Sequence, residues 1–173
     1  ISDSPWPGSA GVPLNAPDTV FADINGDGST DVIQGGFGAI HIRFGSQTGL
    51  SPAVTLPQIS AADATVEPGV DEVRFVDMNG DGLADVVYLT DNWAKIWLGR
   101  GDGTFVYFNR VAYPWQQAVV PASDIHLADL DRAGLQDLIR IGMGSVEWYP
   151  GTADGSFSPV GHMVARPAGA SVD

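Results

Sequence analysis

The sequence predicts an all-β fold made of three similar four-stranded units. Two observations carry this prediction: a repeat of about 50 residues, and short runs rich in Val, Ile, Phe and Trp between glycines and prolines. The 22 Gly and 12 Pro are spread along all 173 residues, which is typical of many short strands joined by turns. No apolar stretch of helical period carries caps at both ends, so we expect no helix.

The repeat is anchored on three nine-residue acidic loops, each of which begins with an aspartate. These aspartates are Asp23, Asp77 and Asp129, spaced 54 and 52 residues apart. An acidic residue stands five positions before each of them, and a glycine stands 22 positions after each. Because the loop, the acidic residue and the glycine recur together, an ordinary β-sandwich with accidental internal similarity is the weaker interpretation.

Four strands are expected around each loop. The first precedes the loop, in "DTVFAD", "EVRFVD" and "DIHLAD", and the second follows it, in "DVIQ", "DVVY" and "DLIR". The third ends at the glycine 22 positions on, in "AIHIRFG", "AKIWLG" and "SVEWYPG". The fourth follows a turn, in "LSPAVTL", "TFVYFNRV" and "SFSPVGHM". Four-stranded units at this period are typical of β-propeller blades, so we predict blades of four antiparallel strands.

The predicted boundaries place blade 1 at 18–70, blade 2 at 71–122 and blade 3 at 123–173. Residues 1–17 contain "WPGSAGVPL", which matches the second half of a repeat, so we interpret them as the tail of a preceding blade. The start "ISDSPW" has neither an initiator Met nor a signal peptide, and we expect a processed product or an excised piece. Propellers have about 4–8 blades, so the rest of a larger parent chain or a second copy is expected to complete the ring.

The composition argues against several classes of function. The formal net charge is −13 with only eight basic residues, so no basic patch could bind nucleic acid. No apolar run approaches the roughly 20 residues of a membrane span, and we expect no membrane insertion. The chain has no Cys and therefore no disulfide framework or thiolate chemistry. Nothing in the sequence nominates a nucleophile or a catalytic carboxylate pair, so we predict that the protein is not an enzyme.

Alternate positions of the first two loops, "DINGDGSTD" and "DMNGDGLAD", offer oxygen donors. Such a carboxylate-rich oxygen set favours Ca²⁺ over zinc, copper or Mg²⁺. An EF-hand is ruled out, because its twelfth position needs Glu and here is Gln34 or Tyr88. A metal-free polar turn is the weaker alternative, since two complete copies stand in equivalent places. We predict about two Ca²⁺ sites, with position 7 offering its carbonyl. The predicted ligands are Asp23, Asn25, Asp27, Ser29 and Asp31, and then Asp77, Asn79, Asp81, Leu83 and Asp85.

The third loop, "DLDRAGLQD", departs from this pattern. Ala133 replaces the carboxylate at position 5, and Arg132 brings a positive charge beside the site. We therefore expect a weak or lost metal site there. Its remaining ligand positions are Asp129, Asp131, Leu135 and Asp137.

These loops, with the "F-G" and "G-x-G-D-G-T-F" runs after them, resemble the FG-GAP or VCBS repeat family, which includes integrin α-subunit propellers. The resemblance covers 18–173 and implies calcium-stabilised β-propeller blades of secreted or cell-surface proteins. "VEWYPG" followed by "GSF", with "FVDMNGDGLADVV", is also similar to repeats of bacterial toxin-complex B subunits and SpvB-like proteins. Blades of this family serve adhesins, lectins, lyases and toxin scaffolds, so the resemblance does not choose among these functions.

We therefore expect a calcium-binding propeller segment of a larger secreted or surface protein, acting as a scaffold or interaction module. Two alternatives stay open: a lectin-like, carbohydrate-binding propeller, and a non-catalytic part of a bacterial toxin or polysaccharide-degrading enzyme. Trp93 and Trp115 fall in expected loops and are candidate contacts to a glycan or protein ligand. Otherwise they fill gaps between blades.

Overall fold

The computed structural model describes residues 14–16, 19–36, 39–57, 59–61, 64–66, 73–115, 121–142 and 144–165. Within these ranges it contains strands β1 to β16, one short 3₁₀ helix and no α-helix. The predicted blade tail at 1–17 lies outside the described residues except for 14–16. In the same ranges, no helix is long and apolar enough to cross a membrane.

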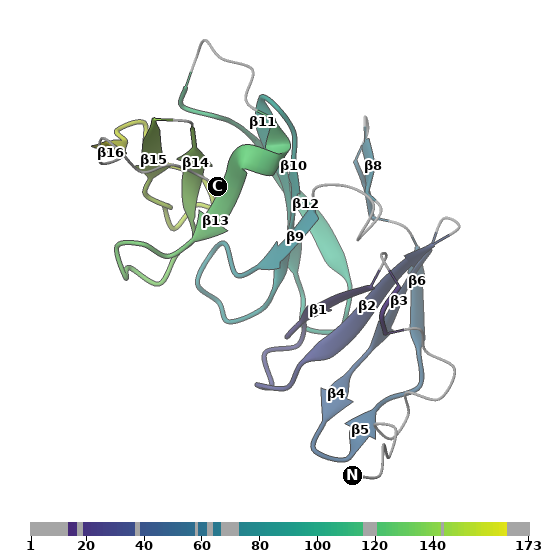
Figure 1. Ribbon diagram of the computed structural model, residues 1–173. Helices are drawn as coiled ribbons and strands as arrows, with labels where there is room; N and C mark the ends of the chain where they lie inside the picture. The colour runs from purple at the N-terminus through teal and green to yellow at the C-terminus, as the bar shows by residue number, and fades with distance from the viewer. Residues whose placement is uncertain are drawn as a thin grey trace.

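Three four-stranded antiparallel sheets follow one another along the chain, which confirms the predicted all-β fold of blade-like units (Figure 1). The first contains β1 (Thr19–Ala22), β2 (Asp31–Gly36), β3 (Ala39–Arg43) and β6 (Val54–Pro57). The second contains β9 (Val73–Val76), β10 (Asp85–Leu89), β11 (Trp93–Gly99) and β12 (Phe105–Ala112). The third contains β13 (Ile125–Ala128), β14 (Asp137–Ile141), β15 (Ser145–Tyr149) and β16 (His162–Ala165).

Two small hairpins and the 3₁₀ helix were not predicted from the sequence. The hairpins pair β4 (Gly45–Ser46) with β5 (Gly49–Leu50), and β7 (Ile59–Ala61) with β8 (Ala64–Val66). The 3₁₀ helix spans Ala122–Asp124. In the first hairpin the Ser46 hydroxyl donates to the Gly49 carbonyl at 2.9 Å, a side-chain bond that short polar turns commonly make.

The fourth strand of the third sheet lies later than predicted. The sequence placed it in "SFSPVGHM", residues 156–163, whereas β16 spans His162–Ala165. Before it, Phe157 forms an isolated bridge with Gly151, and Val160 N donates to Ser158 Oγ at 3.1 Å. Pro159 has no N–H to give to a ladder, so the chain bends here and pairs with β15 only afterwards.

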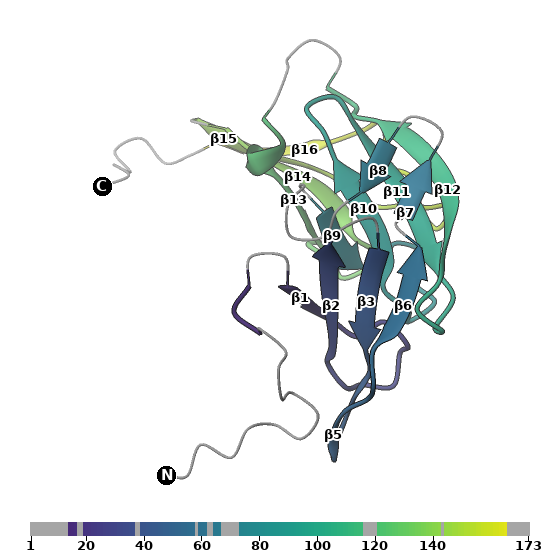
Figure 2. The same ribbon diagram turned by 90° about the vertical axis from the view of Figure 1, so that its right-hand side faces the viewer.

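The sheets stack face to face, as Figure 2 shows, with the first sheet in front of the second. One core lies between the first and second sheets, and another lies between the second and third. In β10 the adjacent residues Val86 and Val87 are both fully buried, yet Val86 belongs to the first core and Val87 to the second. Successive side chains of a strand point to opposite faces, so a sheet packed on both sides needs a continuous apolar run such as the "VVYL" that follows Asp85.

The outer face of the third sheet is apolar but uncovered by the described residues. Ile24 and Met78, each at the second position of its loop, are 0% and 1% exposed because each packs into the core shared with the next sheet. Leu130 holds the same position in the third loop and is 48% exposed. Ile141 and Val164 on this face are likewise exposed. No sheet follows the third within the described ranges, so these side chains lack the contacts of their equivalents.

Candidate metal centres

Each acidic loop joins the first two strands of its sheet (Figure 1). Neighbouring loops approach one another closely. A Cβ built on Gly26 would lie 2.9 Å from the Gly82 carbonyl oxygen, and one on Gly80 would lie 3.4 Å from Leu135 Cδ2. Gly26 also has φ +71°, a left-handed conformation that favours glycine. The three acidic loops therefore line up along one edge of the stacked sheets.

The aspartate at position 9 of each loop is buried and fastens the loop to its sheet. Asp31, Asp85 and Asp137 are at most 1% exposed. Their Oδ2 atoms accept hydrogen bonds from the backbone N–H groups of loop position 2, at 2.8–2.9 Å, from Ile24, Met78 and Leu130. Their Oδ1 atoms accept from the glycine 22 positions after the loop start, at 2.7–2.9 Å, from Gly45, Gly99 and Gly151.

This bond accounts for the glycine that recurs 22 positions after the start of each loop. At Gly99 an added Cβ would collide with the Ala84 carbonyl oxygen, and the same holds for Gly45 against Thr30 and for Gly151 against Gln136. The third strand must approach the end of the loop this closely for its N–H to reach the buried carboxylate. A side chain at these positions would push the strand away.

The first position of each loop caps the turn with its carboxylate. Asp77 accepts from Gly80 N at 2.7 Å and Asp81 N at 3.2 Å through Oδ1, and from Gly82 N at 2.8 Å through Oδ2. Asp23 does the same with Asp27 N at 3.2 Å and Gly28 N at 2.8 Å. These bonds hold the backbone in a tight ring around the carboxylates.

Positions 3 and 5 of the first two loops are bonded to each other. Asn79 Nδ2 donates to Asp81 Oδ2 at 3.0 Å, and Asp81 N donates back to Asn79 Oδ1 at 3.0 Å. Asn25 and Asp27 repeat this pair at 3.0 and 3.1 Å. The N–H of position 7 donates to the position-5 carboxylate, from Ser29 at 2.7 Å and from Leu83 at 2.9 Å.

The third loop arranges its carboxylates differently. Asp129, Asp131 and Asp137 each place an oxygen within 4.8 Å of the others, although Asp129 and Asp131 are exposed. Among the described residues, the first two loops form no such group of three. Arg132 takes the place of Gly26 and Gly80 with φ +64°, a conformation that costs a residue with a side chain more than it costs glycine. The weakness of this third site stays a prediction.

The acidic groups of the first two loops interact electrostatically. Burial raises the pKa of Asp31 and of Asp85, and repulsion from the two other carboxylates of each loop adds to the rise. The backbone hydrogen bonds to these two carboxylates lower the pKa and offset part of it. By contrast, bonds from Ser29 N and from the Asn25 amide lower the pKa of Asp27. A cation among these groups would relieve the repulsion.

The donor set fits a hard divalent cation. At positions 1, 3, 5 and 9 the first two loops can offer carboxylate or amide oxygens, and neither loop contains His or Cys. The thioether of Met78, at position 2 of the second loop, is buried in the second core. The hydrogen bonds above fix the backbone but leave carboxylate lone pairs free, because an ionised carboxylate can accept about four bonds. These residues could hold Ca²⁺.

Trp93 and Trp115 are half-buried rather than free on the surface. Two cationic groups lie over the Trp93 ring: Lys95 Nζ is 5.2 Å and Arg110 Cζ 5.1 Å from the ring centroid. The Trp115 ring packs against Tyr113 at 4.8 Å and Tyr149 at 5.6 Å, at the margin of the second core. Trp93 is the first residue of β11 and not a loop residue as the sequence predicted, whereas Trp115 lies after β12, outside the strands. A contact from either ring to a ligand stays a prediction.

Comparison with known proteins supports the family resemblance. Residues 77–139 match the model of the FG-GAP-like repeat. The matched range runs from the second acidic loop through the second sheet to the third loop. A comparison with curated proteins finds no match.

Solved structures share the fold at low sequence identity. The Photorhabdus luminescens Tc holotoxin pore matches 94% of this chain with a TM-score of 0.78 and 23% identity. An Agrocybe aegerita lectin described as recognising non-reducing terminal N-acetylglucosamine matches 81%, with a TM-score of 0.58 and 20% identity. A TcdB2–TccC3 structure matches 77%, with a TM-score of 0.55 and 23% identity. This chain spans only 8%, 36% and 6% of those chains, so the likeness is to a propeller-like repeat module within each.

Proposed function

We propose that this chain is a non-catalytic, calcium-stabilised propeller module of a larger secreted or surface protein. The observation that supports it best is the buried aspartate at position 9, which joins the acidic loop to the second and third strands through two backbone hydrogen bonds. An ion bound by that loop would fasten three strands of the blade at once. Calcium in this scheme acts on stability and not on chemistry.

The calcium affinity expected of such loops indicates the compartment in which the protein works. Calcium sites of extracellular modules have dissociation constants on the order of 10⁻⁴–10⁻³ M, so loops of this kind fill only where calcium is abundant. A calcium-rich medium outside the cell meets that condition. The absence of Cys leaves metal ions as the available cross-link for an extracellular domain.

The wider role we propose is that of a scaffold within a longer chain. The toxin likeness and the apolar outer face of the third sheet both support a module that packs against further blades. Of the alternatives left open by the sequence, a non-catalytic part of a toxin agrees with this proposal.

Isothermal titration of the calcium-free protein with CaCl₂ tests the proposal, with MgCl₂ as the control titrant. We expect about two sites that prefer Ca²⁺, since Mg²⁺ gives up its water shell reluctantly. Loss of both sites in a double variant, Asp27→Ala with Asp81→Ala, would assign them to the first two loops. Equal heats for both ions, or no saturable heat at all, would sink the proposal.

A further inference from the structure

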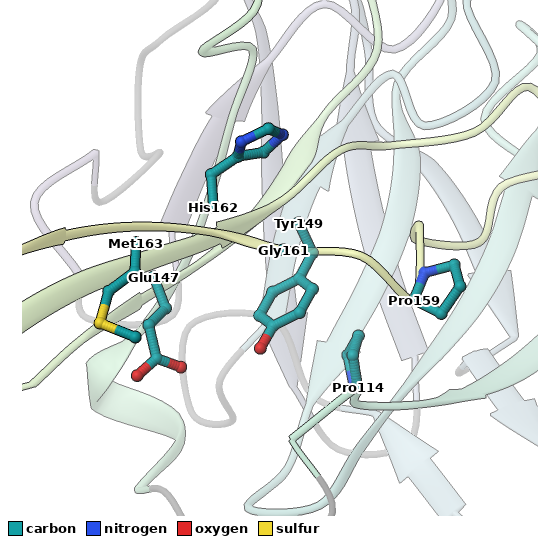
Figure 3. Close-up of a pocket in the computed structure, with 7 residues that line it drawn as sticks. All are labelled: Pro114, Glu147, Tyr149, Pro159, Gly161, His162 and Met163. Atoms are coloured by element: carbon teal, nitrogen blue, oxygen red, sulfur yellow. The ribbon is translucent and has the colours of Figure 1, made fainter.

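A pocket of about 210 Å³ opens between the second and third sheets, and none of the predicted metal ligands lines it (Figure 3). Pro114, from the segment that follows β12, forms one side. Glu147 and Tyr149 of β15, and Gly161 with Met163 from the β16 segment, form the other. The third sheet and the segment before β16 therefore supply most of the lining, and the segment after the second sheet closes one side.

Polar and apolar groups converge on the same side of β15. In Figure 3 the Glu147 carboxylate and the Tyr149 ring with its hydroxyl extend to one side, the side on which Pro114 lies, while the His162 imidazole points to the other. Arg140 Nη1 lies 3.6 Å from the Glu147 carboxylate, so the acidic charge is balanced. The Trp115 ring packs against the Tyr149 ring, with 5.6 Å between the ring centroids.

The equivalent place between the first and second sheets is closed. Lys95 and Trp97 stand 18 and 20 positions after Asp77, as Glu147 and Tyr149 stand after Asp129. Lys95 and Trp97 are each 1% exposed, whereas Glu147 and Tyr149 are half-buried. The opening is thus not a necessary result of stacking two blades. It arises where the sequence of the repeat varies, which is where a binding function is commonly added to a shared fold.

We propose that this pocket binds a single pyranose ring. A sugar ring presents an apolar C–H face and a rim of hydroxyls that both donate and accept hydrogen bonds. The Tyr149 ring with Pro114 and Pro159 can cover the face, while the Glu147 carboxylate and the Tyr149 hydroxyl can bond the rim. Because Arg140 already neutralises Glu147, the pocket favours a neutral ligand over an ion.

The size of the pocket limits the ligand. Sites for drug-sized molecules occupy about 300–1,000 Å³, so a pocket of ≈ 210 Å³ suits one ring and not an extended oligomer. So small an interface predicts weak binding, on the order of a millimolar dissociation constant. This inference does not depend on the calcium sites of the proposed function, and saturating Ca²⁺ can be present in every arm of its test.

The test is an NMR titration of the whole chain with methyl glucoside, methyl galactoside, methyl mannoside and methyl N-acetylglucosaminide, each to about 50 mM. We expect at least one of them to shift the amide signals of Tyr149 and Gly161 saturably. Tyr149→Phe removes the hydroxyl and keeps the ring, and should weaken binding about two- to tenfold. Tyr107→Phe makes the same change on the exposed face of β12 and should leave binding unchanged.

Gly161→Ala gives a second, steric test. The added Cβ would lie 2.7 Å from Tyr149 Cζ, so the Tyr149 ring must move and the pocket must change shape. We expect this variant to lose sugar binding while its NMR spectrum remains that of a folded protein. The proposal is overturned if no pyranoside shifts these amides saturably, or if Gly161→Ala binds as the original does. It is also overturned if sorbitol or free lysine produces the same shifts as the pyranosides, because then the pocket does not select a neutral ring.

Discussion

The Asp85 carboxylate is bonded to the backbone of Gly99, fourteen residues further along the chain, with Gly99 N donating to Asp85 Oδ1 at 2.8 Å. The other oxygen of the same buried carboxylate accepts from Met78 N at 2.9 Å. One side chain thus joins the acidic loop, the second strand and the third strand of the blade. The first and third blades repeat the relationship with Asp31 and Asp137.

Gly99→Ala should destabilise the protein by about 1–3 kcal/mol, the usual cost of forcing an extra group into a packed site. The added Cβ would collide with the Ala84 carbonyl oxygen, so the strand must retreat from Asp85 and strain its hydrogen bond. Gly144→Ala is the matched control, since nothing lies within 4 Å of a Cβ built there. Urea unfolding of both variants measures the difference. Equal midpoints for the two would contradict the role assigned to Gly99.

Local pattern was enough to predict the sheets. Alternation and the acidic loops marked β1, β9 and β13. The glycine 22 positions on is the last residue of β11, but Gly45 and Gly151 lie two residues beyond the ends of β3 and β15. The reason for those glycines could not be read from the sequence, because the Asp85–Gly99 bond spans residues that no local pattern links. The match over 77–139 supports the repeat that these spacings indicated.

Features that depend on contacts between distant segments were missed. β16 begins later than predicted because Pro159 interrupts its pairing with β15. The sequence does not show at which residue this pairing resumes. The meeting of three carboxylates in the third loop was not expected from the loss of the position-5 acid at Ala133. The pocket beside Tyr149 was also missed. Tyr149 and Glu147 fill the space between the second and third sheets less fully than Trp97 and Lys95 fill the equivalent space between the first and second. This difference depends on how the sheets pack together, which the sequence does not give.

Removing calcium should lower the melting temperature at neutral pH. A ligand that binds only the folded state at a hundredfold excess over its dissociation constant stabilises by about 2.7 kcal/mol, or about 5–10 °C for a chain of this length. Two Ca²⁺ would also change the formal net charge from −13 to about −9. Calorimetric scans with and without chelator measure this response. An unmoved melting curve would mean that calcium is not the cross-link.

The same scans on two variants should separate the loops. Asp81→Ala deletes one carboxylate from a complete donor set and should remove about half of the response to calcium. Asp131→Ala, in the loop that carries Ala133 and Arg132, should leave that response almost unchanged. The third loop does gather three carboxylates within 4.8 Å, so the experiment could also give the opposite result, in which Asp131→Ala reduces the response to calcium more than Asp81→Ala does. That result would show that calcium binding depends less on the position-5 carboxylate than on the close approach of the carboxylates at positions 1, 3 and 9.

Met78 and Leu130 occupy the same loop position and should differ sharply in their contribution to stability. Met78 is 1% exposed and packs in the second core, so Met78→Ala should cost about 2–5 kcal/mol. Leu130 is 48% exposed, so Leu130→Ala should cost under about 0.5 kcal/mol. Denaturant unfolding compares the two. A large cost at Leu130 would reveal that something covers the outer face of the third sheet in solution, and light scattering would then show whether it is a second copy.

The acidic loops should also make stability depend on pH in opposite directions with and without calcium. Burial, with repulsion from neighbouring carboxylates, raises the pKa of Asp31 and Asp85 in the folded protein above the unfolded value. Such groups hold protons more tightly when folded. Their stabilising contribution is therefore complete below the unfolded pKa of about 3.9 and is lost as pH rises through the folded value.

In calcium-free buffer we therefore expect the melting temperature to rise as pH falls from 7 towards 4. Below about pH 3.8 the trend should reverse, because the lowered pKa values of Asp27, Asp102 and Asp154 give stability that is lost on acidification. With saturating Ca²⁺ the first trend should invert, since protons compete with the ion for the same oxygens. Asp85→Asn cannot titrate and should flatten the calcium-free rise. Parallel curves with and without calcium between pH 7 and 4 would show that the ion does not bind these carboxylates.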